Sequence, residues 1–150
     1  MSTDDARIRA FRRRVLAYYR RHGRDFAWRR IRNPYHILVS EIMLQQTQVS
    51  RVSKFYPKFL RRFPTISALA SSPLSKILGA WQGLGYNRRA LFLQKIARRV
   101  VDEHRGTVPA DPAMLATLPG IGKNTAGAIA AFAFNTAAPF IETNIRRVYP

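Results

Sequence analysis

The sequence predicts an all-α protein, and three of its features carry that prediction. Apolar residues recur at steps of three and four over several stretches, which is the spacing of one face of a helix. No alternating pattern of useful strand length occurs in the 150 residues. Pro and Gly residues separate the helical stretches at short intervals, so we expect many short helices joined by tight turns.

Caps and helix breakers set the expected helix ends. Gly23 closes the first helix, while Asn33-Pro34 and Ser72-Pro73 each supply an N-cap followed by a first-turn proline. Thr65 and Asp111 are the further N-caps that we expect. Pro57 is expected to kink or split the helix that contains it. The expected helices cover residues 7–22, 33–46, 47–63, 66–70, 74–81, 86–104 and 111–117, followed by one that opens at a hairpin turn and ends near residue 134.

The charge of the chain favours a nucleic-acid partner. Lys and Arg number 26 against 8 acidic residues, which gives a net charge of +18. Arg outnumbers Lys 21 to 5, and Arg binds phosphate through two parallel hydrogen bonds. A basic helix lying on a membrane is the alternative, and the spread of charge along the whole chain makes it the weaker one.

Several site classes are excluded by composition. The chain has no Cys, so disulfides, thiol catalysis and thiolate metal sites are absent from these residues, and the three His residues show no metal-ligand spacing. We therefore predict no metal site. No apolar run is long enough to span a membrane. We expect a cytoplasmic, nucleoid-associated protein without a membrane partner; its oligomeric state stays open.

The stretch from Leu118 to Ala130 predicts an anion-binding hairpin. Gly120 and Gly122 favour a tight turn with uncovered backbone N–H groups, and the helix that follows adds its free N–H groups and positive dipole end. Lys123 adds a full charge at the same place. Nucleic-acid phosphate is the expected ligand, and the alternative is an ordinary Gly-rich helix cap.

Glu41 is one of two acidic residues without an evident structural purpose. It stands in the middle of an almost continuous apolar run, Ile37-Leu38-Val39-Ser40-Glu41-Ile42-Met43-Leu44. Apolar surroundings destabilise the charged carboxylate and raise its pKa, so the group can donate a proton near neutral pH. Alternatively, Glu41 points into solvent or pairs with a neighbouring Arg.

Glu142 is the second acidic residue without an evident structural purpose. It precedes a helical turn with Arg146 and Arg147, whose charges favour an ionised carboxylate. One protonated acid and one ionised carboxylate suit the cleavage of a glycosidic bond, because the acid activates the leaving group and the carboxylate stabilises the oxocarbenium-like centre. Alternatively, Glu142 is a favourable charge at a helix N-terminus.

Three motifs together resemble the adenine DNA glycosylases of MutY type, in the helix-hairpin-helix superfamily that includes endonuclease III. They are Ser40-Glu41-Ile42-Met43-Leu44-Gln45-Gln46-Thr47-Gln48-Val49, Gly83-Leu84-Gly85-Tyr86, and the hairpin from Leu118 through Gly127. The resemblance implies excision of adenine mispaired with 8-oxoguanine or guanine in double-stranded DNA, after the base is flipped out. It also implies a six-helix barrel domain over residues 30–135, with residues 1–29 and 136–150 in an incomplete second helical lobe.

The resemblance assigns roles position by position. Glu41 matches the general acid, and Glu142 matches an essential carboxylate that is Asp in the family. Arg29, Leu44 and Asn124 fall at the base pocket, and Asn124 occupies the position of the nucleophilic lysine of bifunctional relatives, which implies a monofunctional hydrolase. The residues matched to a DNA wedge are Gln46, Leu84 and Tyr86, and those matched to the phosphate-binding hairpin are Gly120, Gly122 and Lys123.

Two departures from the family pattern carry expectations of their own. Glu142 is one methylene longer than Asp, which moves the charge by roughly an ångström. The family continues past the position of Pro150 and often carries a four-cysteine iron–sulfur cluster there, so we expect a truncated chain with no cofactor of its own and with Ile8, Val15 and Leu16 partly uncovered. The alternatives in function are a glycosylase for thymine or uracil opposite guanine, and a non-catalytic DNA-binding module.

Overall fold

The computed structural model describes residues 3–148, and every regular element in that range is helical, which confirms the predicted all-α class. Residues 1–2 and 149–150, the outer ends of the predicted second lobe, lie outside the described residues. The elements are α1 (Thr3–His22), the 3₁₀ helix η1 (Ala27–Arg29), α2 (Pro34–Leu44), α3 (Val49–Arg62), α4 (Ile66–Ser71), α5 (Leu74–Trp81), α6 (Arg88–His104), α7 (Pro112–Leu115), α8 (Lys123–Phe134) and α9 (Thr143–Val148).

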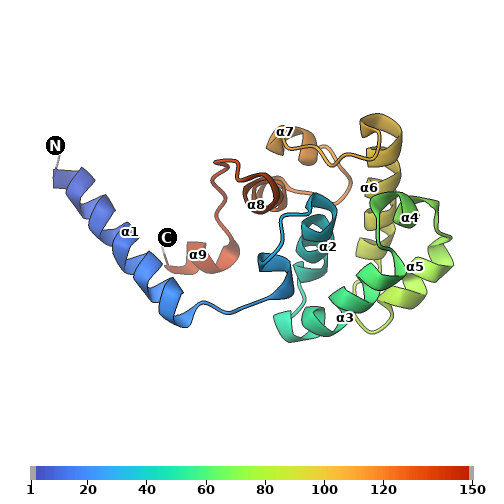
Figure 1. The fold of residues 1–150 in the computed structure, drawn as a ribbon, viewed down its shortest axis with the longest axis horizontal. Helices are drawn as coiled ribbons and strands as arrows, with labels where there is room; N and C mark the ends of the chain where they lie inside the picture. Colours follow the sequence, from blue (N-terminus) through green and yellow to red (C-terminus); the bar gives the residue numbers. More distant parts are fainter. Residues whose placement is uncertain (1–2, 149–150) are drawn as a thin grey trace.

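Helix α2 lies at the centre of the body. It packs against α3 and α8 and also touches α6 and η1 (Figure 1). Its residues from Ile37 to Met43 are buried, as expected for a helix that is apolar on every face. Aromatic rings complete the core around it; Phe59, for example, meets Trp81 edge to face at 5.8 Å between ring centroids. Ser40 and Glu41, the buried polar residues of α2, are therefore enclosed by this core.

The other helices build two groups around α2. Helices α4 and α5 pack on α6, and α7 packs on α8. Between α7 and α8 runs the predicted hairpin, and α8 lies beside α2 (Figure 1). Gln45, directly after α2, donates a hydrogen bond to the Gly120 carbonyl of this hairpin. The two predicted motifs that contain Glu41 and Gly120 thus meet in space, although almost 80 residues of sequence separate them.

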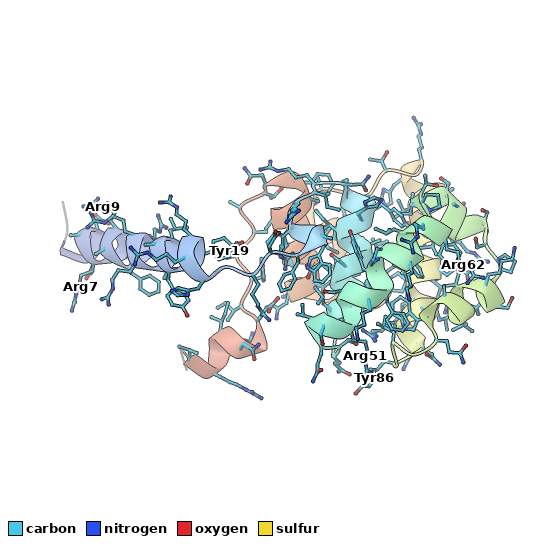
Figure 2. The ribbon with its side chains drawn as sticks, turned by 60° about the horizontal axis from the view of Figure 1, so that its bottom comes forward. Arg7, Arg9, Tyr19, Arg51, Arg62 and Tyr86 are labelled. Atoms are coloured by element: carbon cyan, nitrogen blue, oxygen red, sulfur yellow. The ribbon has the colours of Figure 1, made fainter. Side chains whose placement is uncertain are left out.

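Helix α1 extends away from this body (Figure 1). Its large apolar side chains are about half exposed, with Ile8 at 49%, Val15 at 48% and Leu16 at 54%. This confirms the expectation that the inner face of the first helix is uncovered. Figure 2 shows Arg7 and Arg9 projecting from the same helix, so α1 presents an apolar stripe flanked by positive charge. No helix within residues 3–148 combines the length and apolarity needed to cross a membrane.

Most predicted caps are confirmed. The side chains of Asn33, Thr65 and Asp111 accept hydrogen bonds from backbone N–H groups in the first turns of α2, α4 and α7, at 3.1, 3.1 and 2.9 Å. Ser72 was predicted as an N-cap for α5, and this is wrong. Its hydroxyl donates backward to the Ala68 carbonyl at 2.7 Å, because Ser72 closes α4 instead.

Several predicted helix limits differ from those of the structure. Pro57 does not split α3: the proline is exposed, and buried Tyr56 and Phe59 anchor the helix on either side of it. Helix α1 starts at Thr3 rather than near residue 7, since Asp4 and Asp5 in the first turn suit the positive end of the dipole. Helix α6 starts at Arg88 rather than at Tyr86, whose φ of 50° is left-handed.

Candidate active site

A pocket of about 460 Å³ lies between the end of α2, the start of α8 and the segment before α9. Both singled-out carboxylates line it, together with three of the residues matched to the base pocket and wedge. Its lining residues are Glu41, Leu44, Gln45, Gln46, Asn124, Thr125, Ala128, Glu142 and Asn144. The chain therefore brings its two unexplained acids to one cavity.

The Glu41 carboxyl group is buried at the inner wall of this pocket. Its side chain is 8% exposed, and Oε1 accepts a hydrogen bond from Nη1 of Arg29 at 3.1 Å. Burial raises the pKa of Glu41; the charge and hydrogen bond of Arg29 lower that pKa in part, and the nearby charge of Glu142 raises it again. Both interpretations drawn from the sequence hold in part, because Glu41 pairs with an Arg and is still a buried acid whose pKa is raised.

Arg29 is fixed from both sides. Its neighbour Trp28 is buried in the core, and its own guanidinium lies 3.7 Å from the centroid of the Phe132 ring on α8. Arg29 does not line the main pocket. It lines an adjacent cavity of about 260 Å³ and reaches the site through Glu41. Arg29 thus lies directly behind the acid, and its role at the base pocket stays a prediction.

Glu142 is held over α8 by the residues before it. A Cβ atom on Gly127 would lie 3.0 Å from the Phe140 Cβ, so only glycine lets Phe140 settle this closely on α8. The Asn124 Nδ2 group donates to the Ile141 carbonyl at 3.0 Å. These two contacts hold the segment that carries Glu142, whose exposed side chain lines the same pocket as Glu41. Its position directly before α9 is also compatible with the helix-dipole interpretation.

The hairpin has the predicted shape. Gly120 has a φ of +75°, and the Phe92 ring packs so closely on it that a Cβ atom would lie 2.7 Å from Phe92 Cδ2. Gly122 is the N-cap of α8 with open space at its Cα, and Lys123 is exposed beside it. Gln45 at the end of α2 donates to the Gly120 carbonyl at 3.2 Å. The hairpin is therefore fixed relative to the pocket.

The predicted wedge residues divide into two groups. Gln46 and Tyr86 are exposed, Tyr86 at 63%, and Figure 2 places Tyr86 and Arg51 on one edge of the body. Leu84 is only 1% exposed and packs in the core. The Leu84 side chain follows the tight turn at Gly83, which has a φ of +96°, and its contact with DNA stays a prediction.

Sequence reasoning missed three residues that organise the site. Gln45 joins α2 to the hairpin, Phe132 supports Arg29, and Arg89 binds backbone carbonyls near the end of α2. Arg89 is one of 21 arginines, so nothing in its sequence context separates it from the surface charges. Its burial at 6% exposure is visible only in the fold.

Among the described residues, no group of three or more His, Cys, Asp and Glu side chains is placed to hold a metal ion. These 150 residues contain no Cys, so they supply no thiolate for an iron–sulfur cluster.

The chain belongs to the HhH-GPD superfamily of base excision DNA repair proteins, whose family model matches residues 39–150. It is 46% identical over 135 residues to an adenine DNA glycosylase of Mycobacterium tuberculosis, covering 89% of this chain and 44% of that protein. The human adenine DNA glycosylase is 42% identical over 154 residues, covering 97% and 28%. The chain thus spans less than half the length of these curated relatives.

Among solved structures, a thermostable thymine-DNA glycosylase superposes with a TM-score of 0.91 at 32% sequence identity, covering 98% of this chain and 68% of that one. The helical architecture described above is therefore that of a known DNA glycosylase.

Proposed function

We propose that this chain forms the catalytic part of a monofunctional DNA glycosylase that hydrolyses the N-glycosidic bond of adenine mispaired with 8-oxoguanine or guanine. The observation that carries the proposal is the pocket, in which a buried acid with a raised pKa faces an exposed second carboxylate. The choice of adenine is supported by identities of up to 46% to proteins named adenine DNA glycosylase.

The pocket residues divide the chemistry between them. Protonated Glu41 donates its proton to the adenine ring, the bond from C1′ to the base breaks, and its electron pair leaves with the base. Ionised Glu142 stabilises the positive charge that develops at C1′. Water then adds to C1′ and returns its proton to the Glu41 carboxylate, which restores the acid.

Asn124 supports a hydrolytic reaction without a covalent enzyme intermediate. A Schiff base to the sugar needs a primary amine at the pocket, and Asn124 supplies an amide whose nitrogen already donates to the Ile141 carbonyl. The other pocket residues at the end of α2, Leu44 and Gln46, supply apolar and amide surface against which a flipped base can lie.

The proposed partner is double-stranded DNA that contains a mispair. A net charge of +18 supplies the general attraction, and the hairpin with Gly120, Gly122 and Lys123 supplies an anchor for one phosphate. A repair enzyme of this kind acts where the DNA is, in the cytoplasm at the nucleoid.

A second candidate is removal of thymine or uracil opposite guanine. The solved thermostable thymine-DNA glycosylase has the same fold, with a TM-score of 0.91, and is 32% identical in sequence. The carboxylate pair serves either leaving group, so the base is selected by contacts within the pocket rather than by the acids themselves.

The experiment that tests the function is single-turnover base release from duplexes containing A·8-oxoguanine, A·G, T·G and U·G, followed by alkaline cleavage at abasic sites. Release of adenine alone is the expected result. Release from T·G or U·G would instead support the second candidate function, removal of thymine or uracil opposite guanine. Firm binding of all four duplexes without release would contradict both candidates and leave a DNA-binding module.

The Arg29→Met variant is expected to shift the pH dependence of base release. Glu41 is active when protonated, so the rate falls as pH rises through its pKa. Arg29 lowers that pKa by charge and hydrogen bond, while Glu142 is the other charged group that acts on it. Removing Arg29 raises the pKa further, and the alkaline limb should move to higher pH in single-turnover rates from about pH 5 to pH 9. Arg29→Lys keeps a cation and should shift much less; equal profiles for both variants would contradict the argument.

The Lys123→Ala variant is expected to weaken binding to mispaired and fully paired duplexes alike. Lys123 offers a phosphate contact that carries no sequence information. Its loss should reduce the slope of log affinity against log salt by about 1, as measured by fluorescence anisotropy. Lys58→Ala on α3 removes the same charge from an exposed site away from the hairpin and should have a smaller effect. A loss restricted to mispaired DNA would assign Lys123 a different role.

A further inference from the structure

Arg89 is a buried cation that binds the backbone of two separate loops. It lies in the first turn of α6 at 6% exposure. Its Nη1 group donates to the carbonyl oxygens of Met43 at 2.7 Å and Gln45 at 2.5 Å, near the end of α2. Its Nη2 group donates to the Gly85 carbonyl at 2.9 Å, in the turn before α6. One guanidinium thus joins the loop after the Glu41 helix to the Gly83–Tyr86 turn.

The two carbonyls bound at Gln45 and Gly85 each precede a strained residue. Gln46 has a φ of 53° and Tyr86 a φ of 50°, in the left-handed region that residues with side chains avoid. The other non-glycine residues with positive φ among residues 3–148 are Arg105 and Asn135, which are ordinary C-caps of α6 and α8. Gln46 and Tyr86 lie outside the helices. A turn hydrogen bond from the Thr47 N–H to the Leu44 carbonyl at 3.4 Å closes around Gln46, and Arg89 adds a contact to the carbonyl that precedes each of the two residues.

The same two residues are the exposed members of the predicted wedge. Gln46 lines the pocket beside Glu41, and the Tyr86 side chain is 63% exposed, with the Arg89 guanidinium 5.5 Å from its ring centroid. A left-handed backbone at each position turns the side chain outward from an otherwise tightly packed region. Arg89 binds the carbonyl group that precedes each of these two residues, so it also sets the distance between their side chains.

We propose that Arg89 is a positioning residue that holds Gln46 and Tyr86 as one two-pronged contact for DNA, at a fixed distance from Glu41. The proposal rests on the proposed function, because the two prongs matter only if DNA is the substrate. A guanidinium suits this task better than an ammonium, since its planar fork directs several donors at once toward acceptors in one plane. Arg89 touches neither the base nor the sugar and acts through the two loops.

The test compares Arg89→Met with Arg89→Lys and two controls. Arg98→Met removes an exposed arginine of the same helix, and Leu69→Ala weakens the buried contact between α4 and α6 without touching either loop. Three quantities are measured on each folded variant: hydrogen exchange of the free protein, fluorescence of 2-aminopurine placed next to an A·8-oxoguanine mispair, and single-turnover base release.

We expect Arg89→Met to affect both loops at once. In Arg89→Met, exchange should accelerate together in residues 45–47 and 84–87, the fluorescence rise on binding should be lost, and base release at saturating enzyme should fall by at least about tenfold. Arg89→Lys should restore part of each effect. Arg98→Met should behave as wild type, and Leu69→Ala should lose stability while keeping the fluorescence rise.

Other outcomes overturn the proposal. Unchanged exchange in either loop of Arg89→Met would show that the guanidinium does not couple them. Faster exchange with normal fluorescence and base release would show that coupling of the two loops plays no part in DNA binding or base release. An equal loss of activity in Leu69→Ala would show that the effect of Arg89→Met arises from lost folding stability. If wild-type protein releases no base from any duplex, the proposed function fails, and hydrogen exchange together with the fluorescence change still decides whether Arg89 positions the two contacts.

Discussion

Base release by the Glu41→Gln variant is expected to fall on the order of 10³-fold, which is within the usual contribution of a general acid. The amide has nearly the same shape as the carboxylic acid but holds no proton of suitable acidity. Its oxygen can still accept the hydrogen bond that Arg29 gives to Glu41 at 3.1 Å. Duplex affinity should therefore stay within about twofold of wild type at every salt concentration, as measured by anisotropy beside single-turnover rates. A parallel loss of affinity and rate would contradict the acid role.

The same variant is expected to be more stable than wild type at neutral pH. Burial raises the Glu41 pKa in the folded state, so the acid form stabilises the fold at low pH and this contribution is lost as pH rises through the folded pKa. Gln is neutral at all pH values and avoids that loss. Thermal unfolding near pH 7.5 should show a gain of about 0.5–2 kcal/mol, which shrinks toward about pH 4. A lower melting temperature at neutral pH would mean that the ion pair with Arg29 outweighs the desolvation of Glu41.

Replacing Glu142 by Gln is the second large effect, an expected loss of about 10²–10³-fold in base release. The carboxylate lies at the mouth of the pocket, where its charge can face the positive centre that develops at C1′. Gln keeps the length and polarity of the side chain and removes only the charge. Because Glu142 is exposed, folding stability should change little, which thermal unfolding checks. If Glu142→Gln releases the base at the wild-type rate, Glu142 acts only as a favourable charge at the N-terminus of α9.

The Glu142→Asp variant separates charge from placement. Two contacts fix the backbone before residue 142. Asn124 donates a hydrogen bond to the Ile141 carbonyl, and Phe140 packs closely on Gly127. With the backbone held, a side chain one methylene shorter withdraws the carboxylate from the pocket by roughly an ångström. The rate should fall by about tenfold, less than for Gln. If Asp is faster than Glu in single turnover, the longer side chain of this chain is a defect rather than an adaptation.

The two carboxylates differ in burial, and this difference assigns their roles. Glu41 sits on a helix that is buried on every face, next to a single arginine, so its charged form is disfavoured. Glu142 stands on an exposed segment at the surface of the same pocket. Two identical side chains can therefore take different roles in one pocket, because burial disfavours the charged form of Glu41 while Glu142 is open to solvent.

The sequence alone determined the helical class, most caps, the hairpin and the candidate acids. These depend on neighbours within a few residues: Asn33 and Asp111 cap the helices they begin, the Gly120 turn needs a residue that tolerates positive φ, and the apolar run around Glu41 predicts its burial. Such local rules hold before any tertiary contact forms.

Only the tertiary structure decided how these parts face one another. Leu84 is buried and Tyr86 exposed within one short turn, a choice that the close-packed core makes and the motif does not reveal. Arg29 lies behind Glu41 because the Phe132 ring, about 100 residues away in sequence, supports its guanidinium. Arg89 became distinct from the other 20 arginines only when two loops brought their carbonyls to it. The physical reason is that burial and partner choice depend on long-range contacts, which no single stretch of sequence contains.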